Sequence, residues 1–243
     1  MATFEVSFRT YSRCLARQIY GCVFFNMGRT ITAIKVQKRN PQRVAIYLDG
    51  EFAFGLARII AAWLNIGKVL SNEDILKYKE QDTLEVAYQK ALHFISYRPR
   101  ATAEVQKKLV DKGFSEPVVV ETLDRLQRNG LLNDAQFAQA WVENRMTFHP
   151  RSRRVLAFEL RQKGIVDETI DQALGEKIDE ESLAYEAGQR QVRRLAGLDI
   201  REFRTRLGAF LARRGFPYDV VRPVVDRLWT EVHQPGDAPE HDQ

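Results

Sequence analysis

Three glycines spaced 51 residues apart constrain the fold of this chain more than any other feature. Gly113, Gly164 and Gly215 each stand four residues after a leucine and one before a bulky apolar residue. Apolar residues also recur at fixed distances from the glycines, such as six positions later: Val119, Ile170 and Val221. The dipeptide Pro-Arg recurs at this spacing in the first two copies, at positions 99–100 and 150–151, and is absent from the third. Such a period indicates one structural unit repeated three times.

Each copy divides into three short amphipathic helices. The expected helices are 84–97, 101–112 and 117–129 in the first copy, 134–147, 152–163 and 168–177 in the second, and 181–195, 200–214 and 218–232 in the third. Each glycine follows a basic residue at the end of a second helix, where a left-handed residue terminates helices and a cation favours the helix dipole. We therefore expect three tandem three-helix repeats of helix-turn-helix type.

The chain upstream of the repeats has the alternating pattern of β-strands. Strands are expected at 31–36, 44–48 and 51–54, and Asp49-Gly50 between the last two is typical of a type I′ hairpin turn. A helix at 56–64 would cover this three-stranded meander, because a small uncovered sheet is marginally stable. Ser71, with Asp74 three residues later, predicts the start of a further helix. The expected fold class is thus mainly α, preceded by a small β-meander-containing region.

These patterns divide the chain into six segments. Residues 1–26 form a leader, 27–82 a strand-rich region, 83–132, 133–178 and 179–232 the three repeats, and 233–243 an acidic flexible tail. The leader is rich in arginine and poor in acid, which fits a transit peptide. It equally fits upstream sequence included by a mis-set start, since Met27 directly precedes the first strand pattern. The second interpretation predicts no ordered structure in residues 1–26.

Composition limits the location and chemistry of the protein. Both cysteines lie at positions 14 and 22, so the rest of the chain needs no disulfide and suits a reducing cytoplasm. No apolar run approaches the roughly 20 residues that a membrane span needs, and we expect a soluble, cytoplasmic monomer. After position 29 there is no phosphate-binding Gly-Lys loop, no His-Glu-x-x-His motif and no cysteine, and the histidines are scattered. We expect no enzyme activity, cofactor or metal, with His149 at a helix end and Trp141 and Trp229 in the core.

The repeats, together with specific local motifs, resemble the RecX family, small bacterial modulators of the RecA recombinase. The motifs are Arg98-Pro99-Arg100-Ala101 with Lys112-Gly113-Phe114, Asn129-Gly130-Leu131-Leu132-Asn133-Asp134, and Phe158-Glu159-Leu160-Arg161-Gln162-Lys163-Gly164-Ile165. The strand region is similar to the N-terminal extension of longer members. The resemblance implies an elongated, curved array of repeats that lies along the groove of a RecA–single-stranded DNA filament. It also implies inhibition, without catalysis, of filament growth, ATP turnover, strand exchange and repressor self-cleavage in recombination and the SOS response.

Local clusters of charge support nucleic-acid binding better than the net charge does. Residues 1–29 contribute +3 of the total of +5, whereas basic side chains recur around the turn into the second helix of each copy and along that helix. The candidate DNA- or partner-binding residues are Arg98, Arg100, Lys107, Lys108, Arg145, Arg151, Arg153, Arg154, Arg161, Lys163, Arg204 and Arg206. A row of such residues is typical of a surface that follows phosphates, although solvated helix faces give the same composition. The densest cluster, Arg151, Arg153 and Arg154, is the favoured contact.

A sequence-specific duplex-DNA-binding protein is the alternative, since the repeats have helix-turn-helix character. Such proteins place Arg, Asn or Gln near the start of each recognition helix to reach base edges. The expected third helices begin instead with Pro117, Glu168 and Tyr218. These helix starts suit packing or protein contact, which disfavours the alternative. The favoured interpretation is therefore the one that the resemblance implies: a regulator that binds the RecA filament, with single-stranded DNA bound directly or within it.

Overall fold

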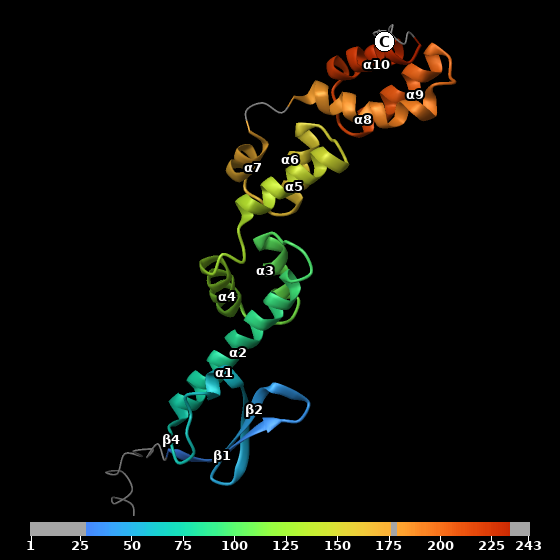
Figure 1. The fold of residues 1–243 in the computed structure, drawn as a ribbon. Coiled ribbons are helices and arrows are strands. Elements are labelled where there is room, and N and C mark those ends of the chain that lie inside the picture. The colour runs from blue at the N-terminus through green and yellow to red at the C-terminus, as the bar shows by residue number, and fades with distance from the viewer. Residues whose placement is uncertain (1–27, 176–178, 234–243) are drawn as a thin grey trace, which may run out of the picture. The chain divides into compact units, whose positions relative to one another are not determined.

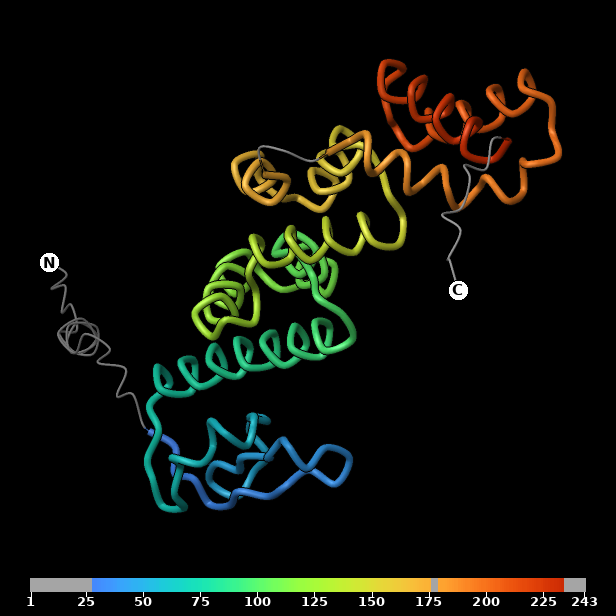
Figure 2. Tube along the Cα trace, turned by 45° about the horizontal axis from the view of Figure 1, so that its top comes forward, coloured from blue at the N-terminus to red at the C-terminus, as the bar shows by residue number. Residues whose placement is uncertain are grey.

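The computed structural model describes residues 28–175 and 179–233. The predicted leader, residues 1–26, and almost all of the predicted tail lie outside these residues. The chain divides into two compact units after Val86, at a point inside helix α2 (Asn72–Ile95). The first unit contains a sheet and the second is helical, as Figures 1 and 2 show.

The first unit is built on a four-stranded antiparallel sheet. Its strands are β1 (Arg29–Gln37), β2 (Asn40–Leu48), β3 (Glu51–Ala57) and β4 (Val69–Leu70), in the order β3-β2-β1-β4. Asp49 and Gly50 between β2 and β3 have φ of 51° and 90°, which confirms the predicted hairpin turn. Strand β4 is an addition to the predicted meander, because two residues are too short to show an alternating pattern.

The helix expected at 56–64 is much shorter than predicted. Only α1 (Arg58–Ala61) is helical, and Leu56 belongs to β3, where it pairs with Val44 and is fully buried. Pairing across the sheet therefore outweighs the helical pattern at this position. The hydrophobic core beneath includes Ile31, Ile46, Leu48, Leu56 and Leu70.

Helix α2 joins two helices that the sequence patterns separate. Its predicted start is confirmed, since the Ser71 hydroxyl accepts from the Asp74 backbone N–H at 3.1 Å and Asp74 accepts in return from the Ser71 N–H at 3.0 Å. The expected break near position 83 is absent, because no glycine or proline interrupts the helix there. Asp82, in the middle of α2, accepts from the Ala57 N–H and from Arg43, each at 2.6 Å, and thereby fixes the helix to the end of β3.

The second unit consists of three three-helix domains, as the repeat predicts. The first comprises the end of α2, α3 (Thr102–Val110) and α4 (Glu116–Arg128). The second comprises α5 (Asp134–Phe148), α6 (Arg153–Gln162) and α7 (Asp167–Leu174), and the third α8 (Glu180–Leu195), α9 (Ile200–Arg213) and α10 (Tyr218–His233). The predicted end of α7 at 177 lies outside the described residues.

The repeated glycine ends the second helix of each domain in the same way. Gly113, Gly164 and Gly215 have φ of +82°, +79° and +89°. In each domain the residue after the glycine donates its backbone N–H to the carbonyl of the repeated leucine, at 3.1–3.3 Å. The predicted left-handed helix cap is therefore confirmed in all three copies.

The glycine turns of the second and third domains also contact the preceding domain. A Cβ on Gly164 would collide with the Cβ of Ala103, and one on Gly215 with Val155 Cγ2 and, at 2.6 Å, with Ser152 Oγ. No atom lies within 4 Å of a Cβ placed on Gly113. The Pro-Arg pair thus precedes α3 and α6. These are the two second helices that the glycine turn of the next domain contacts.

Acidic residues reinforce these two junctions. The N–H of Thr102, at the start of α3, donates to Asp134 Oδ1 at 2.8 Å, and that of Arg153, at the start of α6, donates to Glu180 Oε1 at 2.8 Å. Both acids begin the first helix of the next domain. They satisfy helix-start N–H groups that would otherwise lack an acceptor.

Each domain has its own hydrophobic core. The clusters are centred on Leu109 and Leu126 in the first domain, Leu156 and Leu160 in the second, and Phe203, Leu207 and Leu211 in the third. Within the described residues, every helix is too short or too polar to cross a membrane.

Candidate nucleic-acid interface

The first group of predicted cations gathers around one carboxylate, Glu104 of α3. Glu104 Oε1 accepts from Arg98 at 3.1 Å and from Lys163 of the second domain at 3.1 Å, and Arg100 Nη1 lies 3.8 Å away. Arg100 also lies over the Phe94 ring, 4.1 Å from its centroid. Glu104 therefore brings Arg98 and Arg100 of the first domain close to Lys163 of the second. The carboxylate neutralises part of their positive charge at this domain junction.

The pKa of Glu104 lies below its ordinary value. Burial by itself raises the pKa, but hydrogen bonds from Lys163 and Arg98 and the nearby charge of Lys163 outweigh it. The ionised form thus stabilises the folded state above pH 4.5, the ordinary value for the group. This contribution is lost as the pH falls through the lowered folded pKa.

Replacing Glu104 with glutamine is expected to lower the free energy of unfolding by about 1–3 kcal/mol at pH 7, because three nearby cations lose the negative charge that neutralises them. Urea unfolding at several pH values checks this. The difference from the parent protein should shrink as the pH falls below 4.5 and through the lowered pKa of the parent carboxylate. Glu143→Gln, at an exposed position on α5, is the control and should change little at any pH. If Glu104→Gln lowers the free energy of unfolding by the same amount at acid pH as at pH 7, the prediction is contradicted.

The second group of predicted cations is divided among several acceptors. Arg145 and Arg151 both face Glu159, at 2.8 and 3.2 Å, and Trp141 Nε1 donates to the same carboxylate at 2.9 Å. Arg161 pairs with Asp167 at 2.6 Å.

Within the favoured cluster, Arg153 and Arg154 have different environments. Arg153 donates to the carbonyls of Leu174 and Gly175, where it caps the C-terminus of α7. Arg154 is exposed and forms no ion pair in the part of the chain that the structure describes. The two neighbours therefore differ in function: Arg153 fixes a helix end, whereas the charge of Arg154 faces solvent.

The remaining candidates lie on the second helices of the first and third domains. Lys107 and Lys108 of α3 are exposed, and no carboxylate among the described residues pairs with them. Lys108 Nζ lies 5.5 Å from the centroid of Phe94. On α9, Arg204 pairs with Asp226 at 2.9 Å and Arg206 lies 3.8 Å from Glu202.

Two arginines outside the candidate set lie beside Arg151. Arg190 of α8 donates to the carbonyls of Phe148 and Thr147 at 3.0 and 2.7 Å. Arg214, at the end of α9, donates to the carbonyl of Pro150 at 3.0 Å. Burial lowers the pKa of Arg214, and the charges of Arg151 and Arg190 lower it further. The sequence signal that could have identified this group is the 51-residue register, because Glu104 of the first domain corresponds to Val155 in the second.

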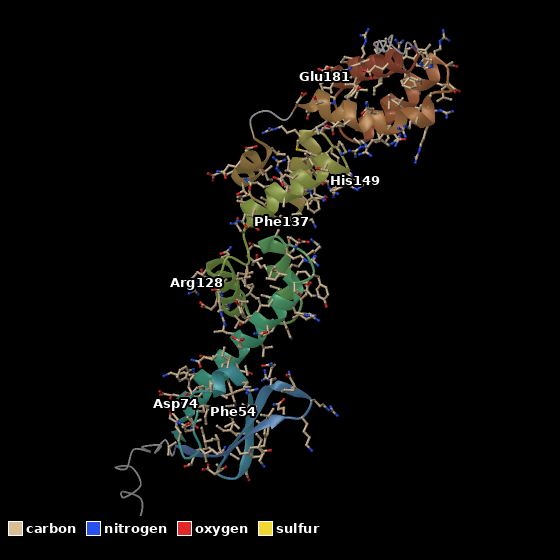
Figure 3. All side chains as sticks on the ribbon, in the orientation of Figure 1. Phe54, Asp74, Arg128, Phe137, His149 and Glu181 are labelled. Atoms are coloured by element: carbon tan, nitrogen blue, oxygen red, sulfur yellow. The ribbon has the colours of Figure 1, made fainter. Side chains whose placement is uncertain are left out.

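The aromatic and histidine predictions agree with the structure. Trp141 stacks on Phe137 with ring centroids 5.9 Å apart, and Trp229 meets Phe203 edge-on at 5.1 Å, so both pack against domain cores. His149 is the residue after α5, at the helix end labelled in Figure 3. Among the described residues, no three His, Cys, Asp or Glu side chains converge on a possible metal position.

Acidic side chains stand at the starts of the third helices. Glu116 begins α4, Asp167 and Glu168 begin α7, and Asp219 lies in the first turn of α10. These acids stabilise the positive end of the helix dipole and would repel a phosphate placed there. Most of the candidate cations lie instead on the second helices and at the domain junctions.

Four family models match the chain. The model described as the regulatory protein RecX N-terminal domain matches residues 29–71. The models for the first, second and third three-helix domains of RecX match residues 87–126, 133–174 and 179–225. The matches therefore cover the strand region and each helical domain.

Relatives and solved structures agree with these matches. The regulatory protein RecX of Bacillus subtilis (strain 168) is 35% identical over 202 residues, covering 82% of this chain and 76% of its own. That of Amycolatopsis mediterranei (strain U-32) is 37% identical over 147 residues, covering 58% and 84%. A crystal structure of a regulatory protein RecX aligns with a TM-score of 0.66 at 27% identity, over 82% of this chain and 99% of that one. RecX from Lactobacillus salivarius aligns with a TM-score of 0.54 at 25% identity, over 61% and 97%.

Proposed function

Because this chain belongs to the RecX family, we propose that it binds the RecA–single-stranded DNA filament in the cytoplasm and restrains it. The restrained activities are filament growth, ATP hydrolysis, strand exchange and repressor self-cleavage. The protein acts by binding, without catalysis of its own. The observation that carries the proposal is the set of tandem three-helix domains, matched one by one to those of a family of regulatory proteins.

Exposed cations on the second helices support a contact with the filament's DNA. Lys107 and Lys108 of α3 and Arg154 of α6 have no carboxylate partner among the described residues. Phosphates that pair with such side chains release condensed counterions, which favours binding at low salt. The acids at the starts of α4, α7 and α10 do not favour insertion of these helices into a DNA groove.

An ATPase measurement tests the proposed function. Substoichiometric amounts of the protein are expected to lower the single-stranded-DNA-dependent ATPase of the RecA recombinase from the same organism. An unchanged rate at an equimolar ratio would contradict the proposal. The triple variant Lys107→Gln, Lys108→Gln, Arg154→Gln should inhibit less than the parent protein at low salt, and the difference between the two should narrow as salt is raised, because the parent has more phosphate contacts to lose.

A matched control removes the same charge elsewhere. Arg128 and Arg227 are exposed and Arg29 is half-buried, and they pair with Asp124, Glu231 and Asp49, each at 2.9 Å. The triple variant Arg29→Gln, Arg128→Gln, Arg227→Gln should inhibit as the parent does. Equal losses in the two triple variants would show that net charge, and not its placement, determines inhibition.

A further inference from the structure

Three guanidinium groups meet around the short connection between α5 and α6. Arg151 belongs to this connection, Arg190 reaches it from α8, and Arg214 reaches it from the end of α9. We call Arg151, Arg190 and Arg214 the junction arginines, because they lie where the second and third domains meet. Arg190 and Arg214 are held in place by donating to the carbonyls of Thr147, Phe148 and Pro150, and among the described residues neither pairs with a carboxylate.

The corresponding junction between the first and second domains shows what this cluster lacks. There Arg100 and Lys163, which correspond to Arg151 and Arg214, surround Glu104, and Lys163 bonds to it at 3.1 Å. At the second junction the position of Glu104 is occupied by Val155, whose Cγ2 faces Gly215. The change keeps the domain contact and removes the acid, while Arg190 adds a cation.

Among the described residues, one carboxylate, Glu159, pairs with a junction arginine, and it is already shared with other donors. Glu159 lies 3.2 Å from Arg151 Nε but also accepts from Arg145 and from Trp141. Arg190 and Arg214 are left with carbonyl acceptors, and the charges of Arg151 and Arg190 lower the pKa of Arg214. Like charges this close repel one another, and an anion placed among them would remove that cost.

The geometry suits an anion that accepts several hydrogen bonds. A guanidinium has five N–H donors, and the carbonyl contacts account for two on Arg190 and one on Arg214. Arg190 is exposed, so its other donors are accessible. Guanidinium groups already fixed by carbonyls lose little freedom on binding and suit the paired oxygens of a phosphate.

We propose that the junction arginines bind a phosphodiester group of single-stranded DNA, so that the junction of the second and third domains is the main DNA contact of this protein. The proposal deepens the function proposed above, on which it rests for the presence of single-stranded DNA. It places the DNA contact at a domain junction rather than along the exposed helix faces alone.

Binding of a labelled oligothymidylate to the full chain, followed by fluorescence anisotropy over a range of salt, tests the proposal. Arg190→Gln is expected to weaken binding roughly tenfold or more, since a charge-assisted hydrogen bond is lost. The slope of log K against log salt should fall by about 0.7 for each phosphate contact removed. Arg227→Gln, which removes the same charge from an exposed ion pair on α10, should leave affinity and slope unchanged.

A second variant tests the comparison between junctions directly. Val155→Glu introduces the acid found at the first junction and should weaken binding and lower the salt slope, because the new carboxylate competes with phosphate for the junction arginines. Circular dichroism and the urea midpoint report whether this variant folds, and Arg190→Gln remains decisive if it does not, because Arg190 is exposed. Unchanged affinity and salt slope in Arg190→Gln would overturn the proposal.

Two further measurements have different purposes. The first tests whether the bound phosphate belongs to a DNA backbone, and the second distinguishes a failure of this proposal from a failure of the proposed function. Thymidine monophosphate and inorganic phosphate should compete only at concentrations far above that of the oligonucleotide, and equal competition would overturn the assignment to a DNA backbone. Parent protein that inhibits the RecA ATPase but binds no free oligonucleotide would overturn this proposal and leave the proposed function standing. Oligonucleotide binding that depends on Arg190, with no effect on the ATPase, would do the reverse.

Discussion

Substituting alanine for Gly215 is expected to lower the free energy of unfolding by about 2–5 kcal/mol. A left-handed backbone costs an L-residue about 1–2 kcal/mol, and an added methyl group in a packed contact costs about 1–3 kcal/mol more. Both costs apply here, because Gly215 has φ of +89° and its Cβ would collide with Val155 and Ser152 of the second domain. The substitution should therefore separate the third domain from the second as well as strain the end of α9.

Gly113→Ala is the matched control for this prediction. Gly113 has nearly the same φ, +82°, but nothing lies within 4 Å of its added Cβ, so only the backbone cost of about 1–2 kcal/mol applies. Urea unfolding gives the two free energies, and hydrogen exchange at the Ser152 amide reports the domain contact, since this N–H donates to the Arg214 carbonyl at 3.1 Å. Ser152 protection should be lost in Gly215→Ala and kept in Gly113→Ala. Equal destabilisation by the two substitutions, with Ser152 protected in both, would contradict the prediction.

Replacing Phe203 with alanine is expected to destabilise the third domain by about 3–5 kcal/mol, the cost of emptying a fully buried aromatic site. The Phe203 side chain has no exposed surface and meets Trp229 and His233 edge-on. Because each domain has a separate core, the damage should concentrate in α8, α9 and α10. Hydrogen exchange should show loss of protection there while the strands of the first unit stay protected.

Phe158→Ala provides the comparison for an exposed phenylalanine. The Phe158 side chain on α6 is 57% exposed, so its removal should change the free energy of unfolding by no more than about 0.5 kcal/mol. A loss of protection in Phe203→Ala that extends evenly through both units would show that the domains unfold together. That result would contradict the independence of the cores.

Regular local signals made most of the secondary structure predictable. Glycine after a basic residue, apolar spacing of three and four, and the Asp-Gly turn all act within a few residues, and the structure confirms the elements that they predict. The errors arose where a distant partner decided the outcome. Leu56 lies in a strand because it pairs with Val44, and β4 exists because Leu70 pairs with Arg29.

The same distinction between local signals and distant partners applies to the candidate interface. The sequence alone determined the three-helix repeats, the left-handed glycine turns and the stretches in which basic residues gather, because each depends on neighbours along the chain. Only the tertiary structure decided which charges are neutralised: Lys163 pairs with Glu104 59 residues away, whereas the partners of Arg190 and Arg214 among the described residues are backbone carbonyls. Charge acts through space and over short distances, so the partners of a cation depend on how the domains pack and not on its position in the chain.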